Sequence, residues 1–264
     1  MNWKLLLWVA ILLLIGCKHE GLGGMKVDEA FQGDTAIMVE AVADGDYARA
    51  DALLARGADI NAKCKEGVTP LLWIMGITKD THKIEYMLKN RADPNYVVPE
   101  KDMASAMYIA AGGNRQDILE LVLKYGGNAS LIGPDNLSML MVAVMQRREE
   151  YFNLLLKHDA DTNWRNQHGE SAASITLTPG RFDWTLYFLE RGFSADFQFL
   201  AGDVETRVAS DRMLPWKAKV IDFLKSKGAV FPAGPRVKSY LKTHSVTEAE
   251  LQDLIYQRKL TLDQ

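Results

Sequence analysis

The side chains best suited to acid–base chemistry form no recognisable catalytic arrangement in this sequence. Two pairs of carboxylates occur, Asp44 with Asp46 and Glu149 with Glu150. Paired carboxylates can serve as general acid and base, but each pair falls where a helix end is expected, and solvated helix ends explain them. A nucleophile elbow and a glycine-rich phosphate loop are both absent from the sequence. An active site built from distant positions would leave no local motif, but we predict a protein that is not an enzyme.

The metal-binding residue types are equally dispersed. The histidines are His19, His82, His158, His168 and His244, and none lies at metal-ligand spacing from a cysteine or a second histidine. His158 falls at a predicted helix C-terminus, where the helix dipole favours a cation. We therefore predict neither a metal site nor a cofactor.

Charge and length narrow the possible functions further. The chain has 264 residues and a formal net charge of -3, from 31 basic and 34 acidic residues. This balance provides no excess of positive charge of the kind that binds nucleic acid. The length allows one elongated domain or two compact ones, each large enough to bury a core.

One cysteine has a context that implies chemistry at the N-terminus. Lys4 precedes an apolar run from Leu5 to Ile15, which suits a signal peptide and is short for a membrane-spanning helix. The run ends in Leu14-Ile15-Gly16-Cys17, which resembles the lipobox of bacterial lipoproteins. The resemblance implies a signal peptide over residues 1–16, a lipidated Cys17, and a tether over residues 17–30. With Lys18 after the cysteine, it implies the periplasmic face of the outer membrane.

The rest of the chain is organised by a repeat. Short turns recur at intervals of 34, 35, 33, 33 and 36 residues, beginning at Gly57, Arg91, Gly126, Asp159, Gly192 and Gly228. A hydroxyl residue lies 21 or 22 residues ahead of four of these turns, namely Thr69, Ser105, Ser138 and Ser171. A hydroxyl ahead of an apolar run is a helix N-cap, and glycine suits the left-handed position that ends a helix. Each repeat is therefore predicted to contain two helices, whose apolar faces are buried only when repeats stack.

The repeat resembles the ankyrin repeat. Gly67-Val68-Thr69-Pro70-Leu71 is similar to that family's Gly-x-Thr-Pro-Leu opening, and Gly57-Ala58-Asp59-Ile60-Asn61 is similar to its ending. The resemblance covers about 190 residues, from roughly Ala36 to Val230. It implies an all-α ankyrin-repeat solenoid of about six units over residues 31–230, and a role in binding other proteins.

The terminal repeats depart from the pattern, as capping repeats must. The fifth has Thr178-Pro179-Gly180 where its helices should join, and the sixth, from about Arg207, has lost its opening. Residues 25–35 are expected to start the N-terminal cap. Ser245-Val246-Thr247-Glu248 predicts a capping box that opens a last helix, so residues 231–264 are expected to form the C-terminal cap.

The resemblance places candidate contacts on hairpin fingers that project between units. The expected tips are 63–66, 96–102, 133–136 and 164–168. The predicted partner-binding residues are Lys63, Lys65, Glu66, Tyr96, Glu100, Lys101, Asp135, Asn136, Trp164, Arg165 and His168. Trp164 is the strongest candidate, because an aromatic side chain on an exposed tip can anchor an interface; packing against a neighbouring finger is the alternative. Cys64 lies on the first finger and could be exposed, whereas Trp73 and Trp184 are predicted to pack.

Two functions fit this layout. Lipid-anchored ankyrin-repeat proteins are similar in layout and address to the immunity proteins of antibacterial phospholipase effectors in type VI secretion. That resemblance implies a rigid surface that covers a secreted toxin, since preorganisation limits the entropy lost on binding. The alternative is an envelope scaffold or assembly factor that binds a resident protein. Either function implies a protein partner, membrane attachment through Cys17, and a monomer when free.

Overall fold

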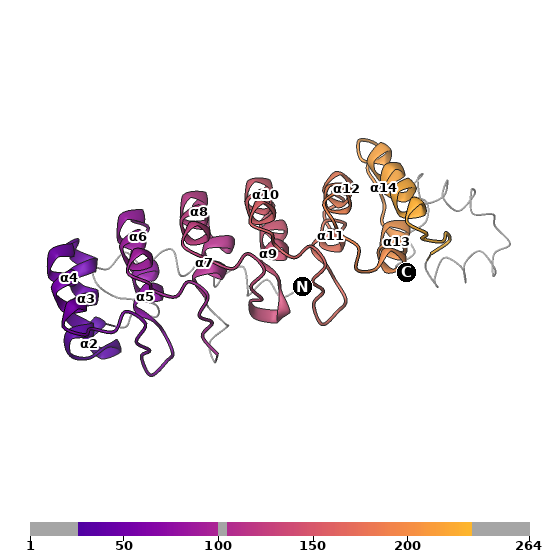
Figure 1. Ribbon diagram of the computed structural model, residues 1–264. Coiled ribbons are helices and arrows are strands. Elements are labelled where there is room, and N and C mark those ends of the chain that lie inside the picture. Colours follow the sequence, from indigo (N-terminus) through magenta and orange to yellow (C-terminus); the bar gives the residue numbers. More distant parts are fainter. Residues whose placement is uncertain (1–25, 100–104, 234–264) are drawn as a thin grey trace. The chain divides into compact units, whose positions relative to one another are not determined.

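The computed structural model describes residues 26–99 and 105–233, which form a series of helix pairs (Figure 1). Within these residues the only strand-like pairing is an isolated bridge between Ile132 and Ser138. Backbone contacts divide the chain between Ala160 and Asp161 into two units, called unit 1 and unit 2 below. The predicted C-terminal helix after Ser245 and the lipidation site at Cys17 lie outside the described residues.

The described part of unit 1 consists of a short leading helix and four helix pairs. The leading helix is α2 (Val27–Ala30), within the stretch expected to start the N-terminal cap. The first helices of the pairs are α3 (Gly33–Asp44), α5 (Pro70–Ile77), α7 (Ala106–Gly112) and α9 (Met139–Met145). The second helices are α4 (Tyr47–Ala55), α6 (Thr81–Lys89), α8 (Gln116–Lys124) and α10 (Glu149–Lys157). First helices contact first helices of neighbouring pairs, and α6, α8 and α10 do the same in the second row.

The predicted caps begin the first helices. Thr69 Oγ1 accepts the Leu72 N–H at 3.4 Å, and Ser105 Oγ accepts the Tyr108 N–H at 3.0 Å. Ser138 and Ser171 cap α9 and the first helix of unit 2 in the same way. The residues that follow are apolar and buried, including Trp73 at 1% exposure. The N-cap prediction is therefore confirmed in all four repeats.

Unit 2 contains two helix pairs within residues 161–233, and one prediction about it was wrong. The pairs are α11 (Ala172–Ile175) with α12 (Phe182–Glu190), and α13 (Phe197–Thr206) with α14 (Leu214–Ser226). Helix α13 begins at Asp196, whose carboxylate accepts the Phe199 N–H at 2.8 Å. The last repeat therefore has its opening at Asp196 and not near Arg207. The pattern missed it because Asp196 follows Gly192 directly, without a hairpin between them.

A ladder of amide side chains joins successive repeats within each unit. In unit 1, Asn95 Nδ2 donates to the Gly126 carbonyl at 2.9 Å, and Asn95 Oδ1 accepts the Asn128 N–H at 2.7 Å. Asn61 makes the same two bonds to Arg91 and Asp93. In unit 2, Asn163 repeats the arrangement with Gly192 and Ser194. These bonds fix the register between the loops of successive repeats, and those loops lead into the hairpins.

Candidate functional site

Two of the projecting hairpins share one backbone geometry. Cys64 and Val68 pair through the Cys64 N–H at 3.1 Å, and the Gly67 N–H closes the turn on the Cys64 carbonyl at 2.9 Å. In unit 2, the Asn166 N–H donates to Glu170 and the Gly169 N–H to Asn166, both at 2.9 Å. Gly67 and Gly169 both have φ of +77°, a conformation that glycine adopts without steric cost. The hydrogen-bonded turns make these hairpin tips compact.

The hairpin before α9 has a different tip. Asp135 and Asn136 lie in the left-handed region with φ of 52° and 61°, and the Leu137 N–H donates to the Pro134 carbonyl at 3.0 Å. The tip contains the short helix η1 (Pro134–Asn136). Asp and Asn tolerate this conformation better than other non-glycine residues. Both side chains are exposed, as predicted for partner-binding residues.

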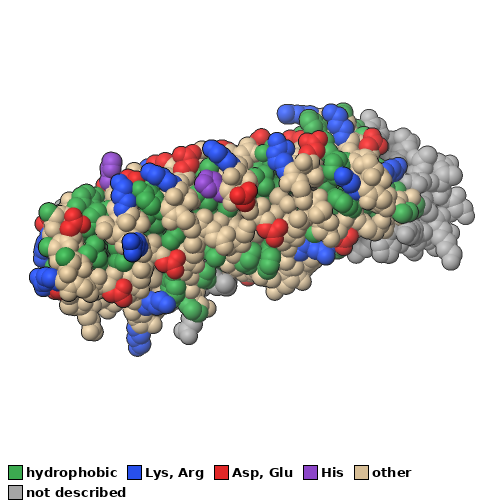
Figure 2. All heavy atoms as spheres, viewed as in Figure 1, with side chains coloured by type: hydrophobic (Ala, Val, Ile, Leu, Met, Phe, Trp, Pro, Cys, Tyr) green, Lys and Arg blue, Asp and Glu red, His purple; other side chains and the backbone are tan. Residues whose placement is uncertain are grey.

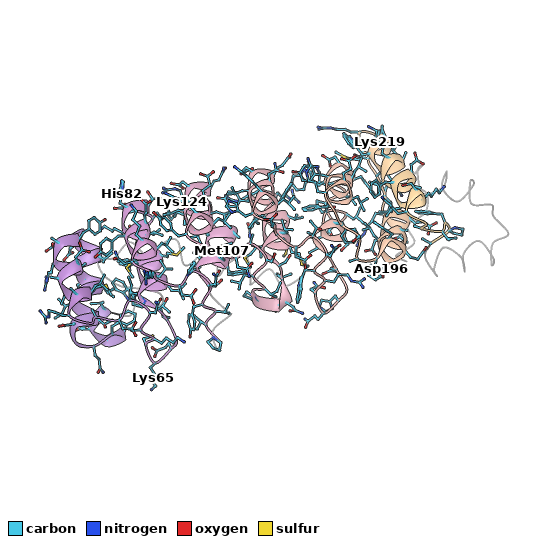
Figure 3. The ribbon with its side chains drawn as sticks, in the orientation of Figure 1. Lys65, His82, Met107, Lys124, Asp196 and Lys219 are labelled. Carbon is cyan, nitrogen blue, oxygen red and sulfur yellow. The ribbon has the colours of Figure 1, made fainter. Side chains whose placement is uncertain are left out.

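The first finger packs against the next one in unit 1. The Lys63 ammonium lies 4.2 Å from the centre of the Tyr96 ring, which suits a cation–π contact. A Cβ placed on Gly67 would meet Val98 Cγ1 at 3.1 Å, so the two segments approach closely there. Lys63 and Tyr96 are thus brought together, with Tyr96 half-buried. Lys65 extends from the tip, on the opposite side of unit 1 from His82 and Lys124 (Figure 3).

Trp164 does not occupy an exposed tip. The turn of its hairpin lies at 166–169, and Trp164 is half-buried two residues before it. Arg165 pairs with Asp196 at 3.2 Å and lies 5.8 Å from the centre of the Phe199 ring. Trp164 is therefore half-buried and not at an exposed tip, because the hairpin folds against α13; its role in partner binding stays a prediction. Of the three candidates here, His168 is the exposed one.

The remaining candidates have mixed environments. Glu66 is half-buried and accepts a hydrogen bond from the Cys64 thiol at 3.3 Å. Cys64 is buried, and burial together with Glu66 raises the pKa of its thiol. Glu100 and Lys101 lie outside the described residues. The structure therefore exposes Lys63, Lys65, Asp135 and Asn136 in unit 1 and His168 in unit 2.

Several exposed apolar residues were not predicted from the sequence. Met145 ends α9 at 52% exposure, Phe199 lies on α13 at 43%, and Trp216 lies on α14 at 37%. The sequence did contain a signal for the helix that carries Trp216. Pro215 lies in the first turn of that helix, where proline is favoured. Met145 takes the position that Gly76 and Gly112 occupy in the two preceding repeats.

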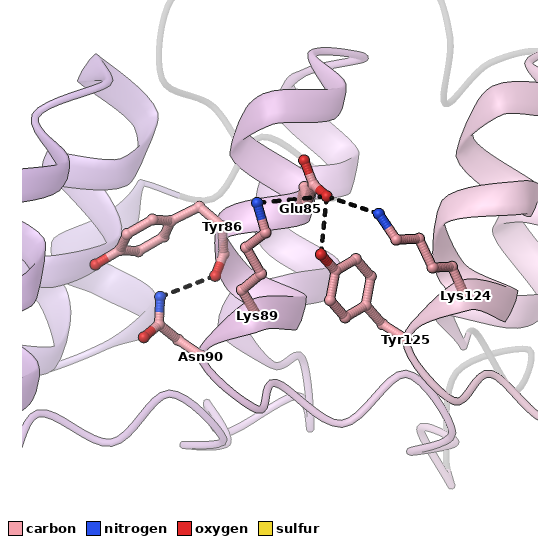
Figure 4. A network of polar contacts seen from close by, with 6 residues as sticks. All are labelled: Glu85, Tyr86, Lys89, Asn90, Lys124 and Tyr125. Carbon is pink, nitrogen blue, oxygen red and sulfur yellow. Dashed lines mark hydrogen bonds and ion pairs between the residues drawn. The ribbon is translucent and has the colours of Figure 1, made fainter.

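Polar contacts between the second helices connect the repeats away from the hairpins. Glu85 Oε1 accepts the Tyr125 hydroxyl at 2.8 Å and lies 3.3 Å from Lys124 Nζ and 3.4 Å from Lys89 Nζ (Figure 4). Hydrogen bonds from Tyr125 and Lys124 lower the pKa of this carboxyl. The network joins α6 to α8. Lys89 and Lys124 are exposed and Glu85 is partly exposed, so these ion pairs have the character of surface contacts.

The two carboxylate pairs lie at helix ends, as expected. Asp46 caps α4, accepting the Arg49 N–H at 3.1 Å, and Glu149 and Glu150 lie in the first turn of α10. On the face in Figure 2, side chains of both signs are interspersed. Within residues 26–99 and 105–233, no three His, Cys, Asp or Glu residues form a group that could hold a metal ion. None of the helices in these ranges combines the length and apolarity needed to cross a bilayer.

The described residues define a class of architecture: an all-α array of helix pairs with hairpins between them. Residues 72–166 match a family model described as ankyrin repeats, in three copies. The chain therefore contains ankyrin repeats, and its described helices form an ankyrin-repeat solenoid, as predicted. Ankyrin repeats indicate a role in protein–protein interaction. No curated protein matches the chain.

Proposed function

We propose that this protein binds and neutralises a protein partner, as an immunity protein against an antibacterial secreted effector of the phospholipase type. A lipid on Cys17 would hold it at the periplasmic face of a bacterial membrane, most usefully the outer membrane. An enzyme that attacks membrane lipids from the periplasm is best intercepted at that membrane. The support is the lipobox-like ending at Cys17 joined to an interaction array.

The hairpins of unit 1 are the observation that carries the binding role. They present exposed Lys65, Asp135 and Asn136 on backbones closed by hydrogen bonds. A preformed surface loses little conformational entropy when a partner docks. Such a surface suits an inhibitor that must bind tightly without rearranging.

The test is titration of secreted phospholipase activity from the same bacterium with the purified protein. We expect inhibition that saturates at one protein per enzyme. Lys65→Glu should weaken inhibition about tenfold, the effect of about 1.4 kcal/mol. The matched control is Lys157→Glu, which makes the same charge change at an exposed position at the end of α10.

Two results would count against the proposal. If Lys65→Glu and Lys157→Glu weaken inhibition equally, the hairpins are not part of the interface. Recovery of resident envelope proteins as stoichiometric partners, with no secreted enzyme inhibited, would favour the envelope scaffold instead.

A further inference from the structure

Helix α14 carries the most exposed tryptophan of the described residues. Trp216 is 37% exposed, whereas Trp73 and Trp184 are buried and Trp164 is half-buried. Val208, in the segment that leads from α13 to α14, is 36% exposed. Large apolar side chains left in contact with water mark surfaces that bind a partner or a membrane when they occur together. Trp216 and Val208 therefore direct attention to the surface around the start of α14.

The same part of unit 2 concentrates positive charge in a chain that is acidic overall. Residues 207–227 contain six basic and two acidic side chains, a formal net charge of +4, whereas the whole chain has a net charge of -3. Lys217 is the one buried basic residue of this segment. The exposed basic residues are Arg207, Arg212, Lys219, Lys225 and Lys227. The exposed tryptophan thus lies in a basic surface.

Helical spacing places the tryptophan and one of these cations on the same face of α14. Trp216 and Lys219 are three residues apart and both are exposed. The Lys219 ammonium lies 4.6 Å from the centre of the Trp216 ring, so the indole and the charge are presented to solvent together. The buried side of the helix consists of Lys217, Val220 and Leu224. Lys219 lies on the opposite side of unit 2 from Asp196, where α13 begins (Figure 3).

This combination fits the surface of an anionic phospholipid bilayer. Tryptophan is enriched where a membrane meets water, because its ring suits the level of the headgroups. Lysine and arginine beside it are attracted to anionic headgroups. An acidic protein surface would also attract these cations, but a bilayer offers phosphates and an apolar layer together, which suits the convex face of a single helix.

We propose that Arg212, Trp216 and Lys219, called the aromatic–basic face below, bind the surface of an anionic phospholipid bilayer. The indole of Trp216 enters the headgroup layer, and the two cations pair with lipid phosphates. This contact depends neither on a lipid at Cys17 nor on binding of a protein partner. It would hold unit 2 against the membrane by a second, independent attachment.

Acetylation of lysine amines in the full-length protein tests this proposal, because an ammonium covered by headgroups reacts slowly. The reaction rate of Lys219 is measured by peptide mass spectrometry without vesicles, with phosphatidylcholine vesicles, and with vesicles that also contain phosphatidylglycerol. We expect the anionic vesicles to slow the reaction of Lys219 about tenfold and the phosphatidylcholine vesicles to leave it unchanged. Lys157, exposed at the end of α10, is the internal control and should react at one rate throughout.

Variants separate the aromatic–basic face from the rest of the surface. Trp216→Ala and Arg212→Glu should each remove most of the protection of Lys219, with every variant compared with its own rate in the absence of vesicles. Arg212→Glu changes an exposed side chain and keeps the aromatic ring. Lys65→Glu is the matched control, because it makes a comparable charge reversal at an exposed hairpin position and should leave the protection intact. Arg212→Glu should in turn leave inhibition of a secreted enzyme in solution unchanged, so the two proposals can fail separately.

Three results would overturn the proposal. The first is an equal rate for Lys219 with anionic vesicles and without vesicles. The second is protection that persists in both Trp216→Ala and Arg212→Glu. The third is protection of Lys219 by the secreted enzyme and not by vesicles, which would assign this face to a protein partner.

Discussion

Single residues in the left-handed conformation end the second helices of the repeats. Gly57, Gly126, Gly192 and Gly228 have φ between +91° and +101°. Arg91 and Asp159 take the same place with φ of 69° and 59°. A side chain in this region is strained, and Arg91 lacks the tolerance of Asp.

Replacing Arg91 with glycine should stabilise the protein. Arg91→Gly relieves the left-handed strain, which exceeds the entropy cost of glycine, and we expect a gain of about 0.5–1 kcal/mol. The measurement is the midpoint of denaturant unfolding at constant slope. Gly57→Ala is the reverse control, because a Cβ there meets nothing within 4 Å and only the backbone conformation is penalised. Equal stability of Arg91→Gly and wild type would contradict this account.

Lys217 should make stability depend on pH in the alkaline range. Burial lowers the pKa of its ammonium from 10.5 to about 8, against an opposing effect of Glu205. Between these values the unfolded chain binds more protons than the folded one, so stability rises with pH. Relative to Lys217→Met, the wild type should gain about 3 kcal/mol in the free energy of unfolding from pH 7.5 to 10.5. A constant difference between the two proteins would show that Lys217 titrates normally.

At the scale of elements, the hairpins and the amide ladder depend on each other. The ladder residues lie in the loops that lead from each second helix to the next hairpin, so their bonds set where each hairpin leaves the array. In unit 1, Asn61 and Asn95 bridge consecutive repeats, and Ser130 Oγ donates to the Asp159 carbonyl at 3.3 Å at the following step. The helices alone would leave these loops without a fixed register.

Removing one step of the ladder should destabilise unit 1. Asn95→Ala deletes a donor and an acceptor and leaves the Gly126 carbonyl and the Asn128 N–H without this partner. Both groups can then bind water, so each lost hydrogen bond should cost only its net contribution. For the two bonds together, we expect a loss of about 1–3 kcal/mol in the free energy of unfolding. Asn114→Ala, at an exposed position before α8, should change stability by less than about 0.5 kcal/mol. Similar losses in the two variants would show that the ladder contributes nothing specific.

At the scale of the whole molecule, the proposed function needs both a binding array and an anchor. The array is shown by its helix pairs and by the ankyrin-repeat match over residues 72–166. The anchor rests on the sequence around Cys17. The two cysteines separate these roles, because Cys64 is buried within unit 1 and is not available for lipidation.

The proposed anchor can be tested in cells of the organism that makes the protein. Cys17→Ser removes the thiol that lipidation requires, and the protein should move from the membrane fraction to the aqueous fraction. Stable attachment needs more than one acyl chain, so its loss should be nearly complete. Cys64→Ser is the control and should stay in the membrane fraction. Retention of Cys17→Ser in the membrane would refute lipid anchoring.

Short-range signals in the sequence determined the class of fold. Hydroxyl caps such as Ser105, apolar triplets such as Leu121-Val122-Leu123, and glycines at helix ends act within a few residues of where they stand. Their regular spacing was therefore sufficient to predict stacked helix pairs. The same locality placed the exposed hairpin residues Asp135 and Asn136.

Only the tertiary structure decided which residues are buried between repeats. Trp164 is half-buried and Arg165 reaches Asp196, because that hairpin packs against a helix whose start at Asp196 the repeat pattern did not reveal. Cys64 is buried beside Glu66, on a finger whose Lys63 contacts Tyr96 of the next repeat. Burial of a side chain depends on segments about 30 residues away that stack on it. Local sequence patterns do not contain that information.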